Sequence, residues 1–463
     1  MSPWRTDPAA LPGAGDRVLV LGLGLSGAAA ARHLLRLGTN LTVSDAAGDE
    51  VVRERASALS GATVRLGDDD PSAAVASADL VVVSPGILER SPALIAAYAS
   101  GVPVWSEIEL AYRLSRAPIV GVTGTNGKTT TTRMLAAALT EAGYRTTAAG
   151  NIGFPLADAA VEDLDVIVAE LSSFQLRNVV AFRAPVGLVL NVAEDHLDWH
   201  GGYDRYLAAK ARLFENQHPG DVAIHHDDPA SARAAASSRG RRLAFSTEAV
   251  PASGAGVDDD GWIVVPEGRV LEAKTMRARG GPALKNAVAA AAGACAFGAE
   301  PGAVGRALAT FEPLPHRMEL IAEIAGVSYV NDSKATNPHA VLAALAGLDS
   351  VVLIAGGRNK GLDLLTIAAG ADAVRFVVAL GESAGNIEGA FAASDVPVER
   401  AGTMDEAVAR AAAAALQGDT VLLSPGCASF DMFADYKARG EAFRAAVKRI
   451  ASGDAAGTKG GTA

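Results

Sequence analysis

The chain has 463 residues, 49% of them hydrophobic and 20% charged, which is the composition of a globular protein with about three domains. Its 52 acidic and 41 basic residues give a net charge of −11, which argues against a nucleic-acid-binding surface. No apolar run reaches the roughly 18 residues of a membrane span, and Cys295 and Cys427 form no metal or disulfide pattern, so we expect a cytoplasmic protein that binds neither membrane nor nucleic acid.

Short apolar runs of β type alternate with alanine-rich helical stretches along the chain. In chain order the runs are RVLVLG (17–22), LTVSD (41–45), DLVVVSPG (79–86), PIVGVTG (118–124), DVIVAEL (165–171), VGLVLN (186–191), VSYVND (327–332), SVVLIAGG (350–357), VRFVVALG (374–381) and TVLLSPG (420–426). Near-continuous apolar strands separated by helices are typical of parallel sheets covered on both faces. The sequence therefore predicts an α/β fold, with ligands at the polar clusters that end nearly every run.

Two breaks divide these elements into three domains. One falls near residue 106, and the other near residues 313–315, where prolines interrupt a helical zone. We expect a Rossmann-like domain over 1–106, a central domain with a mostly parallel sheet over 107–313, and a second Rossmann-like domain over 314–463. The acidic, turn-rich segment 218–282 has a possible hairpin at WIVVPEGRV, and both ends, 1–15 and the tail from Ser452, are expected to be loose.

A glycine-rich turn follows the first strand. Gly22, Gly24 and Gly27 are spaced as in dinucleotide-binding loops, and Asp45 ends the next strand, where an acidic residue binds a ribose hydroxyl. The pattern predicts that a diphosphate or ribose lies there. A tight turn without a ligand, and the cofactor site of an NAD-dependent dehydrogenase, are the alternatives.

A second glycine-rich loop, GVTGTNGKTTT (121–131), lies between a strand and a helix. Such a loop turns its backbone N–H groups around phosphate oxygens, with Lys128 on the β- and γ-phosphates and Thr129 on Mg²⁺. Val122 occupies a position where the strict P-loop pattern has glycine. The loop still predicts an ATP site, formed by Gly124, Thr125, Asn126, Gly127, Lys128, Thr129 and Thr130. A non-catalytic nucleotide switch would share it.

Three charged or titratable residues follow the loop. Glu170 ends a buried strand, His196 lies just past another, and Lys210 follows at helical spacing. A carboxylate and an imidazole near a triphosphate favour Mg²⁺ binding. Each residue singly also has a structural interpretation, as a solvated glutamate, a capping histidine or a surface lysine.

Polar residues are dense at three strand ends in the last third of the chain. They are NDSKATN (331–337), GGRNKG around Lys360, and SPGCASFD (424–431). Lys334 and Lys360 are candidates to pair with a phosphate or a carboxylate, and His316-Arg317 to hold a nucleotide. A simple nucleotide switch has no use for the SPGCAS and NDSKATN clusters, and a dehydrogenase leaves GTNGKTT, Glu170 and His196 unexplained.

Together these motifs resemble the Mur ligase family, which builds the peptide stem of peptidoglycan, over nearly the whole chain. GTNGKTT is shared with folylpolyglutamate synthetases, whereas NDSKATN, GNIG (150–153), ELSSFQL and SPGCASFDMF resemble the members that add D-glutamate to UDP-N-acetylmuramoyl-L-alanine. The resemblance implies an ATP-dependent ligase that forms an acyl phosphate and works as a monomer in cytoplasmic peptidoglycan precursor synthesis. Another Mur-type or folylpolyglutamate-type amide ligase is the alternative.

The resemblance also implies site residues. Lys128, His196 and Lys210 are catalytic, and Asn286, Arg317, Asp332 and Lys334 join the loop in binding ATP. Of two Mg²⁺ ions, one lies at Thr129 and Glu170 and the other at His196 and Lys210. An ammonium about 4 Å from Mg²⁺ is repelled by about 8 kcal/mol at an effective dielectric of ~20, and the family avoids this by carbamylating the lysine with CO₂.

The resemblance also implies which residues bind the two substrates that are joined. The positions that match those holding D-glutamate are Thr336, Lys360, Ser429 and Phe430. Those matching the UDP-substrate site are Leu25, Ser26, Asp45, Ser84, Pro85, Gly86 and Asn151, so the resemblance implies that the dinucleotide-type loop binds UDP.

Overall fold

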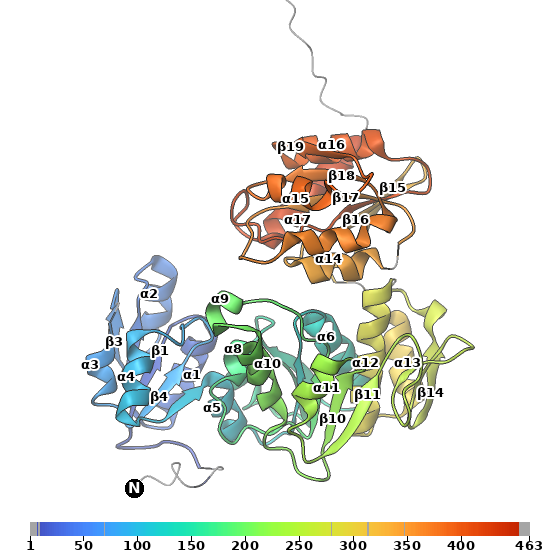
Figure 1. Cartoon of the computed structure of the whole chain (residues 1–463). Coiled ribbons are helices and arrows are strands. Elements are labelled where there is room, and N and C mark those ends of the chain that lie inside the picture. Colours follow the sequence, from blue (N-terminus) through green and yellow to red (C-terminus); the bar gives the residue numbers. More distant parts are fainter. Residues whose placement is uncertain are drawn as a thin grey trace, which may run out of the picture. The chain divides into compact units, whose positions relative to one another are not determined.

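The computed structural model describes residue 7 and residues 10–68, 70–278, 280–312, 314–346 and 348–452 (Figure 1). Most of the expected loose ends therefore lie outside the described residues, which include neither residues 1–6, 8 and 9 nor the tail from 453 onwards. All ten strands that the apolar runs predict are present. They belong to three separate sheets, each of which contains parallel strands.

The first sheet has five parallel strands in the order β3-β2-β1-β4-β5. They are β1 (Arg17–Leu21), β2 (Asn40–Asp45), β3 (Thr63–Leu66), β4 (Leu80–Val83) and β5 (Val104–Ser106). The helices are α1 (Leu25–Arg36), α2 (Glu50–Ser57), α3 (Ser72–Val75), α4 (Pro92–Ser100) and α5 (Glu107–Leu114). The strand order reverses at β1, and parallel α/β sheets bind ligands at such a switch point.

The central sheet has six parallel strands in the order β11-β10-β9-β6-β8-β7. They are β6 (Ile119–Thr123), β7 (Thr146–Gly150), β8 (Val166–Glu170), β9 (Val186–Val189), β10 (Val222–His226) and β11 (Arg241–Phe245). Its helices are α6 (Lys128–Glu141), α7 (Leu156–Ala159), α8 (Ser173–Leu176), α9 (Leu197–His200), α10 (Tyr203–Ala211), α11 (Pro229–Ala235), α12 (Gly281–Phe297) and α13 (Pro301–Thr310). β6 is buried between β9 and β8, so the loop that follows it lies at the middle of the sheet edge.

The turn-rich segment of the central domain forms a small antiparallel sheet. Its strands are β12 (Gly256–Val257), β13 (Trp262–Val265) and β14 (Gly268–Glu272), so the hairpin predicted at WIVVPEGRV is confirmed. α13 packs closely on β14, because a Cβ atom added at Gly305 would lie 2.3 Å from the carbonyl oxygen of Val270.

The third sheet has six strands in the order β15-β16-β20-β17-β18-β19, and β15 alone is antiparallel to its neighbour. They are β15 (Glu319–Ile324), β16 (Val327–Asn331), β17 (Val351–Gly356), β18 (Val374–Leu380), β19 (Val398–Ala401) and β20 (Thr420–Leu423). The helices are α14 (Pro338–Leu345), α15 (Ala384–Phe391), α16 (Met404–Ala414) and α17 (Tyr436–Ala451). Separate hydrophobic cores cover its two faces, one around Ile367 and the other around Phe443.

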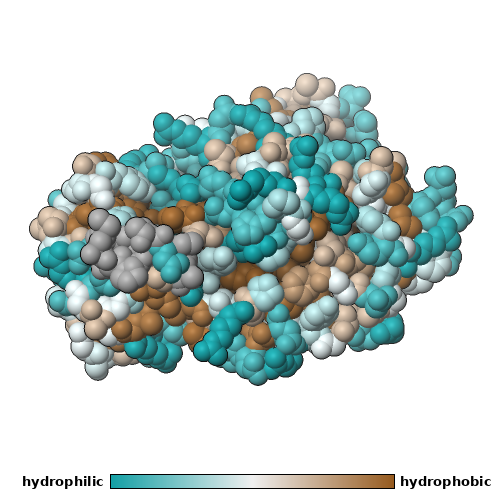
Figure 2. Space-filling model, turned by 90° about the horizontal axis from the view of Figure 1, so that it is seen from below, coloured by the Kyte–Doolittle hydropathy of each residue, from teal (hydrophilic) through white to brown (hydrophobic). Residues whose placement is uncertain are grey.

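The chain divides into two compact units. The first comprises Met1–Val192, Trp199–Met276 and Lys285–Thr310, and the second Ala193–Asp198, Arg277–Leu284 and Phe311–Ala463. The first two sheets and the small antiparallel sheet belong to the first unit, and the third sheet to the second. On the face drawn in Figure 2, hydrophilic residues are interspersed with smaller hydrophobic areas. Among the described residues, no helix is both long and apolar enough to cross a membrane.

Candidate active site

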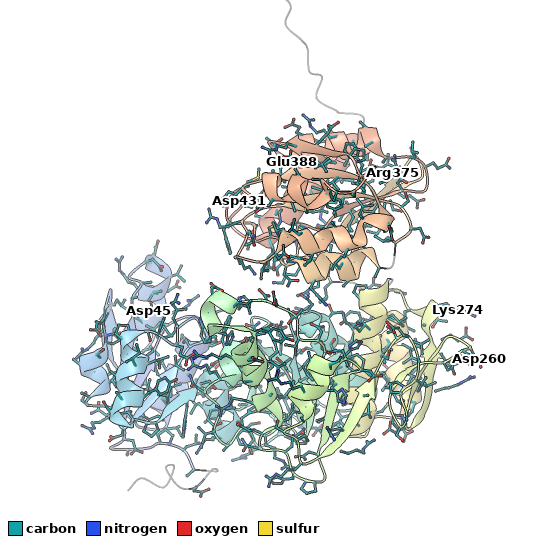
Figure 3. The ribbon with its side chains drawn as sticks, viewed as in Figure 1. Asp45, Asp260, Lys274, Arg375, Glu388 and Asp431 are labelled. Carbon is teal, nitrogen blue, oxygen red and sulfur yellow. The ribbon has the colours of Figure 1, made fainter. Side chains whose placement is uncertain are left out.

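The turn after β1 is held by two side chains from neighbouring strands. Asp45, at the carboxyl end of β2 (Figure 3), accepts hydrogen bonds from the backbone N–H of Leu23 at 2.6 Å and of Ala47 at 2.8 Å. Ser84, after β4, donates to the carbonyl oxygen of Gly22 at 2.8 Å. A Cβ atom at Gly27 would lie 1.9 Å from that same oxygen, so only glycine fits. The loop ends of β1, β2 and β4 thus meet, as the glycine spacing predicts.

The loop after β6 has the geometry of a phosphate-binding loop. Gly124 (φ 155°) and Gly127 (φ 84°) adopt backbone conformations that side chains disfavour, and α6 begins at Lys128. Lys128 Nζ donates to the carbonyl oxygens of Gly124 and Thr125, at 2.8 Å each. Asn191 fixes the loop's centre, because its side chain accepts from the N–H of Asn126 at 2.8 Å and donates to its carbonyl oxygen at 3.1 Å.

Asn286 of α12 lies against this loop from the other side. Its Oδ1 accepts from the hydroxyl of Thr131 at 3.3 Å. A Cβ atom at Gly127 would lie 2.4 Å from the same Oδ1, so the loop and α12 are in direct contact. The structure thus brings Asn286 to the predicted ATP loop, although 155 residues separate it from Thr131 in the sequence.

Glu170 presents a carboxylate oxygen that suits a cation. The side chain ends β8, next to β6, and is 2% exposed. Its Oε1 accepts from the Asn151 side chain at 3.0 Å, whereas Oε2 is buried without a hydrogen-bond partner. A buried carboxylate oxygen with no donor is destabilising unless something pairs with it, and oxygen is the ligand that Mg²⁺ prefers. Glu170 and the adjacent loop therefore fit a Mg²⁺ ion.

Lys210 is buried beside the phosphate-binding loop, so its interpretation as a surface lysine is wrong. It is 1% exposed, and its Nζ donates to the carbonyl oxygen of Gly124 at 2.8 Å. The same nitrogen lies 4.5 Å from the centroid of the Tyr206 ring, whose hydroxyl contacts the Thr125 hydroxyl at 3.0 Å. His196 belongs to the short segment 193–198 of the second unit, where its backbone is left-handed (φ 52°).

In the second unit, the predicted nucleotide residues lie around the end of β16. Asp332 is 8% exposed and accepts from the Ser424 hydroxyl at 3.1 Å and from the N–H of Met318 at 3.3 Å. Burial raises the pKa of Asp332 to about 7, although these hydrogen bonds and the charge of Arg317 oppose the rise. Lys334 Nζ lies 3.9 Å from the centroid of the Tyr436 ring.

The four residues predicted to hold the amino acid come from the loops after β16, β17 and β20, which are adjacent parallel strands. Backbone hydrogen bonds join these loops, from Gly426 to Ala335 and from Arg358 to Ala428, at 2.9 Å each. Thr336, Lys360, Ser429 and Phe430 therefore belong to one edge of the sheet. Ser429 is 2% exposed and Phe430 is 64% exposed, so this edge has both a buried polar group and an open aromatic one.

Sequence reasoning missed two polar residues that fix these loops. Asn191 lies two residues past the end of β9, and its position just after a strand was the available signal. Arg439 lies in α17 and is 2% exposed. Its burial could not be predicted from the sequence, because an arginine in a helix is ordinarily exposed to solvent.

Three parallel or mostly parallel sheets, with a phosphate-binding loop at the centre of one and polar strand-end clusters on the others, define a multidomain nucleotide-binding α/β protein. Three family models match the chain: the "Mur ligase MurD-like, N-terminal domain" at residues 16–106, the "Mur ligase middle domain" at 122–294 and the "Mur ligase, glutamate ligase domain" at 316–427. The chain belongs to the Mur ligase family.

Similar proteins span nearly the whole chain. A UDP-N-acetylmuramoylalanine--D-glutamate ligase of Frankia casuarinae is 47% identical, covering 94% of each chain, and one of Pelotomaculum thermopropionicum is 42% identical, covering 94% of this chain and 98% of the relative. Among solved structures, the UDP-N-acetylmuramate–alanine ligase of Thermotoga maritima aligns with a TM-score of 0.57 at 17% identity, covering 94% of this chain and 99% of the other. That likeness shows the shared fold.

Proposed function

We propose that this protein is an ATP-dependent ligase that joins D-glutamate to UDP-N-acetylmuramoyl-L-alanine. The observation that carries the proposal is that relatives 39–47% identical over 93–94% of this chain have the name UDP-N-acetylmuramoylalanine--D-glutamate ligase. The phosphate-binding loop at the middle of the central sheet supports ATP as the energy source.

The reaction proceeds in two steps. ATP phosphorylates the carboxylate of the L-alanyl group, giving an acyl phosphate and ADP. The amine of D-glutamate then attacks the acyl carbon, and phosphate leaves as the amide forms. Negative charge on the transferring phosphoryl group is offset by Lys128 and by the backbone N–H groups at the start of α6.

We assign ATP, the UDP substrate and D-glutamate to three separate groups of residues. ATP is held by the loop residues Gly124–Thr130 with Asn286, Arg317, Asp332 and Lys334. The UDP substrate lies along Leu25, Ser26, Asp45, Ser84, Pro85 and Gly86, with Asn151 toward the reacting end. D-glutamate is held by Thr336, Lys360, Ser429 and Phe430. The meeting of the β1, β2 and β4 loop ends supports the second assignment, and the joined loops after β16, β17 and β20 support the third.

Two Mg²⁺ ions complete the proposed site. Thr129 and Glu170 would hold one, and the unpartnered Oε2 of Glu170 supports this assignment. His196 and Lys210 would hold the other, as the family resemblance implies. The ions would neutralise charge on the phosphates. Addition of CO₂ to the Lys210 amine, with loss of a proton, would give the carbamate oxygens that a Mg²⁺ ligand requires.

The Lys210 carbamate is tested by chemical rescue. We expect Lys210→Ala to be nearly inactive and to regain part of its activity with added acetate or bicarbonate, which supply an oxygen ligand. Lys210→Arg should not be rescued, because a guanidinium stays positive and fills the space. Full activity of Lys210→Ala in CO₂-free buffer would contradict the proposal.

The function itself is tested by phosphate release from ATP with UDP-N-acetylmuramoyl-L-alanine, with and without D-glutamate. A site built for two carboxylates rejects amino acids that lack one, because its polar groups stay unpaired. We expect D-glutamate to be preferred to D-alanine and L-lysine. Equal turnover with D-alanine or L-lysine would favour another Mur-type or folylpolyglutamate-type ligase.

A further inference from the structure

Arg439 is among the largest fully buried side chains of the described residues, and it has three hydrogen bonds within the second unit. Its Nε donates to the hydroxyl oxygen of Ser333 at 3.0 Å and its Nη2 to the carbonyl oxygen of Ser333 at 2.8 Å. Its Nη1 donates to the carbonyl oxygen of Cys427 at 3.0 Å. A Cβ atom at Gly357 would lie 3.2 Å from Nη1, so the guanidinium also touches the loop after β17.

All three acceptors of this cation are neutral. No ion pair in the described part of the chain includes Arg439, and burial lowers its pKa only to about 10, so it stays charged at neutral pH. The Asp431 carboxylate acts on it electrostatically but forms no ion pair with it. Burying a charge without a directly paired counter-ion is costly, and a core packed for stability alone would favour an apolar side chain. The planar fork of arginine, however, can hold two separate backbone segments at fixed directions.

The two segments that Arg439 joins are the loops after β16 and β20. Ser333 lies three residues before Thr336, and Cys427 lies two residues before Ser429. The Ser333 hydroxyl also donates to the carbonyl oxygen of Tyr436 at 2.8 Å, which ties the first loop to the start of α17. Arg439 is thus a second link between the halves of the proposed amino-acid subsite, beside the backbone hydrogen bond from Gly426 to Ala335.

We propose that Arg439 is a positioning residue for the amino-acid substrate, which sets the separation of the loops after β16 and β20 through Ser333 and Cys427. This inference rests on the proposed function for the place of the amino-acid subsite. Because misplacing binding groups by about 1 Å weakens productive binding by large factors, losing the link should act on the amino acid rather than on the UDP substrate, whose proposed residues lie in the first unit.

The test is steady-state kinetics of Arg439→Lys, Arg439→Met and Ser333→Ala. Lysine keeps the charge but has one nitrogen in place of the fork. We expect both Arg439 variants to raise the KM for the amino acid about tenfold or more, with the KM for UDP-N-acetylmuramoyl-L-alanine unchanged. Ser333→Ala removes one hydrogen-bond acceptor of Arg439 and leaves the backbone intact, so it should raise the KM for the amino acid by a smaller factor. This variant still tests the inference if an Arg439 variant fails to fold.

Arg444→Met is the matched control. Arg444 lies on the same helix and pairs with Glu319 at 2.6 Å, away from these loops, so its loss should leave the KM for the amino acid unchanged. The amino acid that the wild-type protein uses is identified first. An error in the D-glutamate assignment is then detected independently of the Arg439 variants. The inference is overturned if Arg439→Lys and Ser333→Ala keep the wild-type KM for that amino acid, or if the KM for the UDP substrate rises equally.

Discussion

Lys128 has its ammonium group folded over the phosphate-binding loop, where it donates to two carbonyl oxygens of that loop. We expect the same nitrogen to reach a phosphate bound at the loop's N–H groups. We expect Lys128→Ala to lower phosphate release from ATP by a factor on the order of 10²–10³, because one preorganised charge on the transferring group is lost.

Lys274→Ala is a suitable control for Lys128→Ala. Lys274 (Figure 3) is 80% exposed and pairs with Glu272, outside the proposed site, so its loss should leave the rate unchanged. Circular dichroism would show that both variants are folded. Wild-type rates in a folded Lys128→Ala protein would rule out the loop as the ATP site.

Glu107 makes stability depend on pH. It is 2% exposed, accepts from the Gln175 side chain at 2.7 Å, and has no partner for Oε2. Burial raises the pKa of Glu107 from 4.5 to about 7. Between these values the folded protein keeps a proton that the unfolded chain releases, so its contribution to stability is lost as pH rises from about 4.5 to about 7.

We expect Glu107→Gln to be more stable than the wild type at pH 8, by up to about 3 kcal/mol, and to lose that advantage at pH 4.5. Asp332 shares the upward pKa shift and is unchanged in both proteins, so the difference between them isolates Glu107. Urea unfolding at the two pH values measures it. A difference that does not change with pH would show that Glu107 is ionised in the folded protein.

Residue patterns predicted the strand-end groups but not the buried charges. Asp45, Glu170 and the glycines of both loops follow from their positions after apolar runs, because ligands bind at the carboxyl ends of parallel strands. Glu107 and Arg439 are buried by helices and loops that are distant in sequence. Nothing local in the sequence distinguishes them from solvent-exposed charges.

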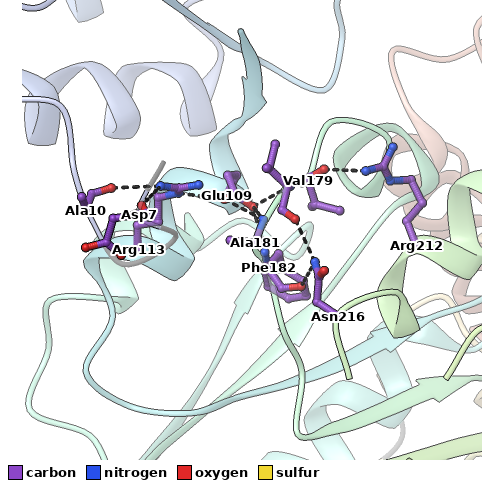
Figure 4. A network of polar contacts seen from close by, with 10 residues as sticks. Asp7, Ala10, Glu109, Arg113, Val179, Ala181, Phe182, Arg212 and Asn216 are labelled. Carbon is purple, nitrogen blue, oxygen red and sulfur yellow. Dashed lines mark hydrogen bonds and ion pairs between the residues drawn. The ribbon is translucent and has the colours of Figure 1, made fainter. Parts of the chain in front are cut away.

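At the scale of elements, one buried carboxylate holds three successive N–H groups of the loop before β9 to α5. Glu109 is 0% exposed and accepts from the N–H groups of Val180, Ala181 and Phe182 at 2.8–3.0 Å (Figure 4). It also accepts from Arg113 Nε at 2.8 Å. This carboxylate connects α5, which directly follows the last strand of the first sheet, to the loop that leads into β9 of the central sheet.

We expect Glu109→Gln to lower the free energy of unfolding by about 3–5 kcal/mol, because an amide offers one acceptor oxygen and removes the charge that pairs with the buried Arg113 side chain. Urea unfolding measures the change. Glu141→Gln, at an exposed pair with Arg306, should cost less than about 1 kcal/mol. Equal losses for the two variants would mean that the Glu109 contacts add no more than a surface pair.

Most of the strands that the sequence did not predict in the three main sheets lie at sheet edges, and the interior strand β10 is the exception. β3 is an edge strand whose residues Thr63, Val64 and Arg65 are all exposed, so it lacks the apolar run of a strand buried on both faces. β19 is likewise an edge strand, with Glu399 and Arg400 exposed. The other interior strands were predicted because burial on both faces requires continuous apolar residues, whereas β10 ends in two histidines.

At the scale of the whole molecule, the third sheet has every strand and both of its cores within residues 319–447. A sheet covered on both faces by its own helices meets the requirement for independent folding. We expect residues 311–452, expressed alone, to unfold cooperatively with a stability of about 5–15 kcal/mol. A gradual transition, or strong binding of a hydrophobic dye, would show that this part needs the rest of the chain.

The three main sheets exchange no strands, and this has a consequence for synthesis on the ribosome. The strands of the first sheet end at Ser106 and those of the central sheet at Phe245, before β15 begins at Glu319. Each sheet can therefore pair its strands before the next has been translated, and nascent chains tend to fold domain by domain in this way. The central domain is complete only some time after its sheet, because its last two helices, α12 and α13, are not fully translated until Thr310. Until then the nascent central sheet would expose apolar surface. A chaperone would therefore find the largest exposed apolar surface during this interval.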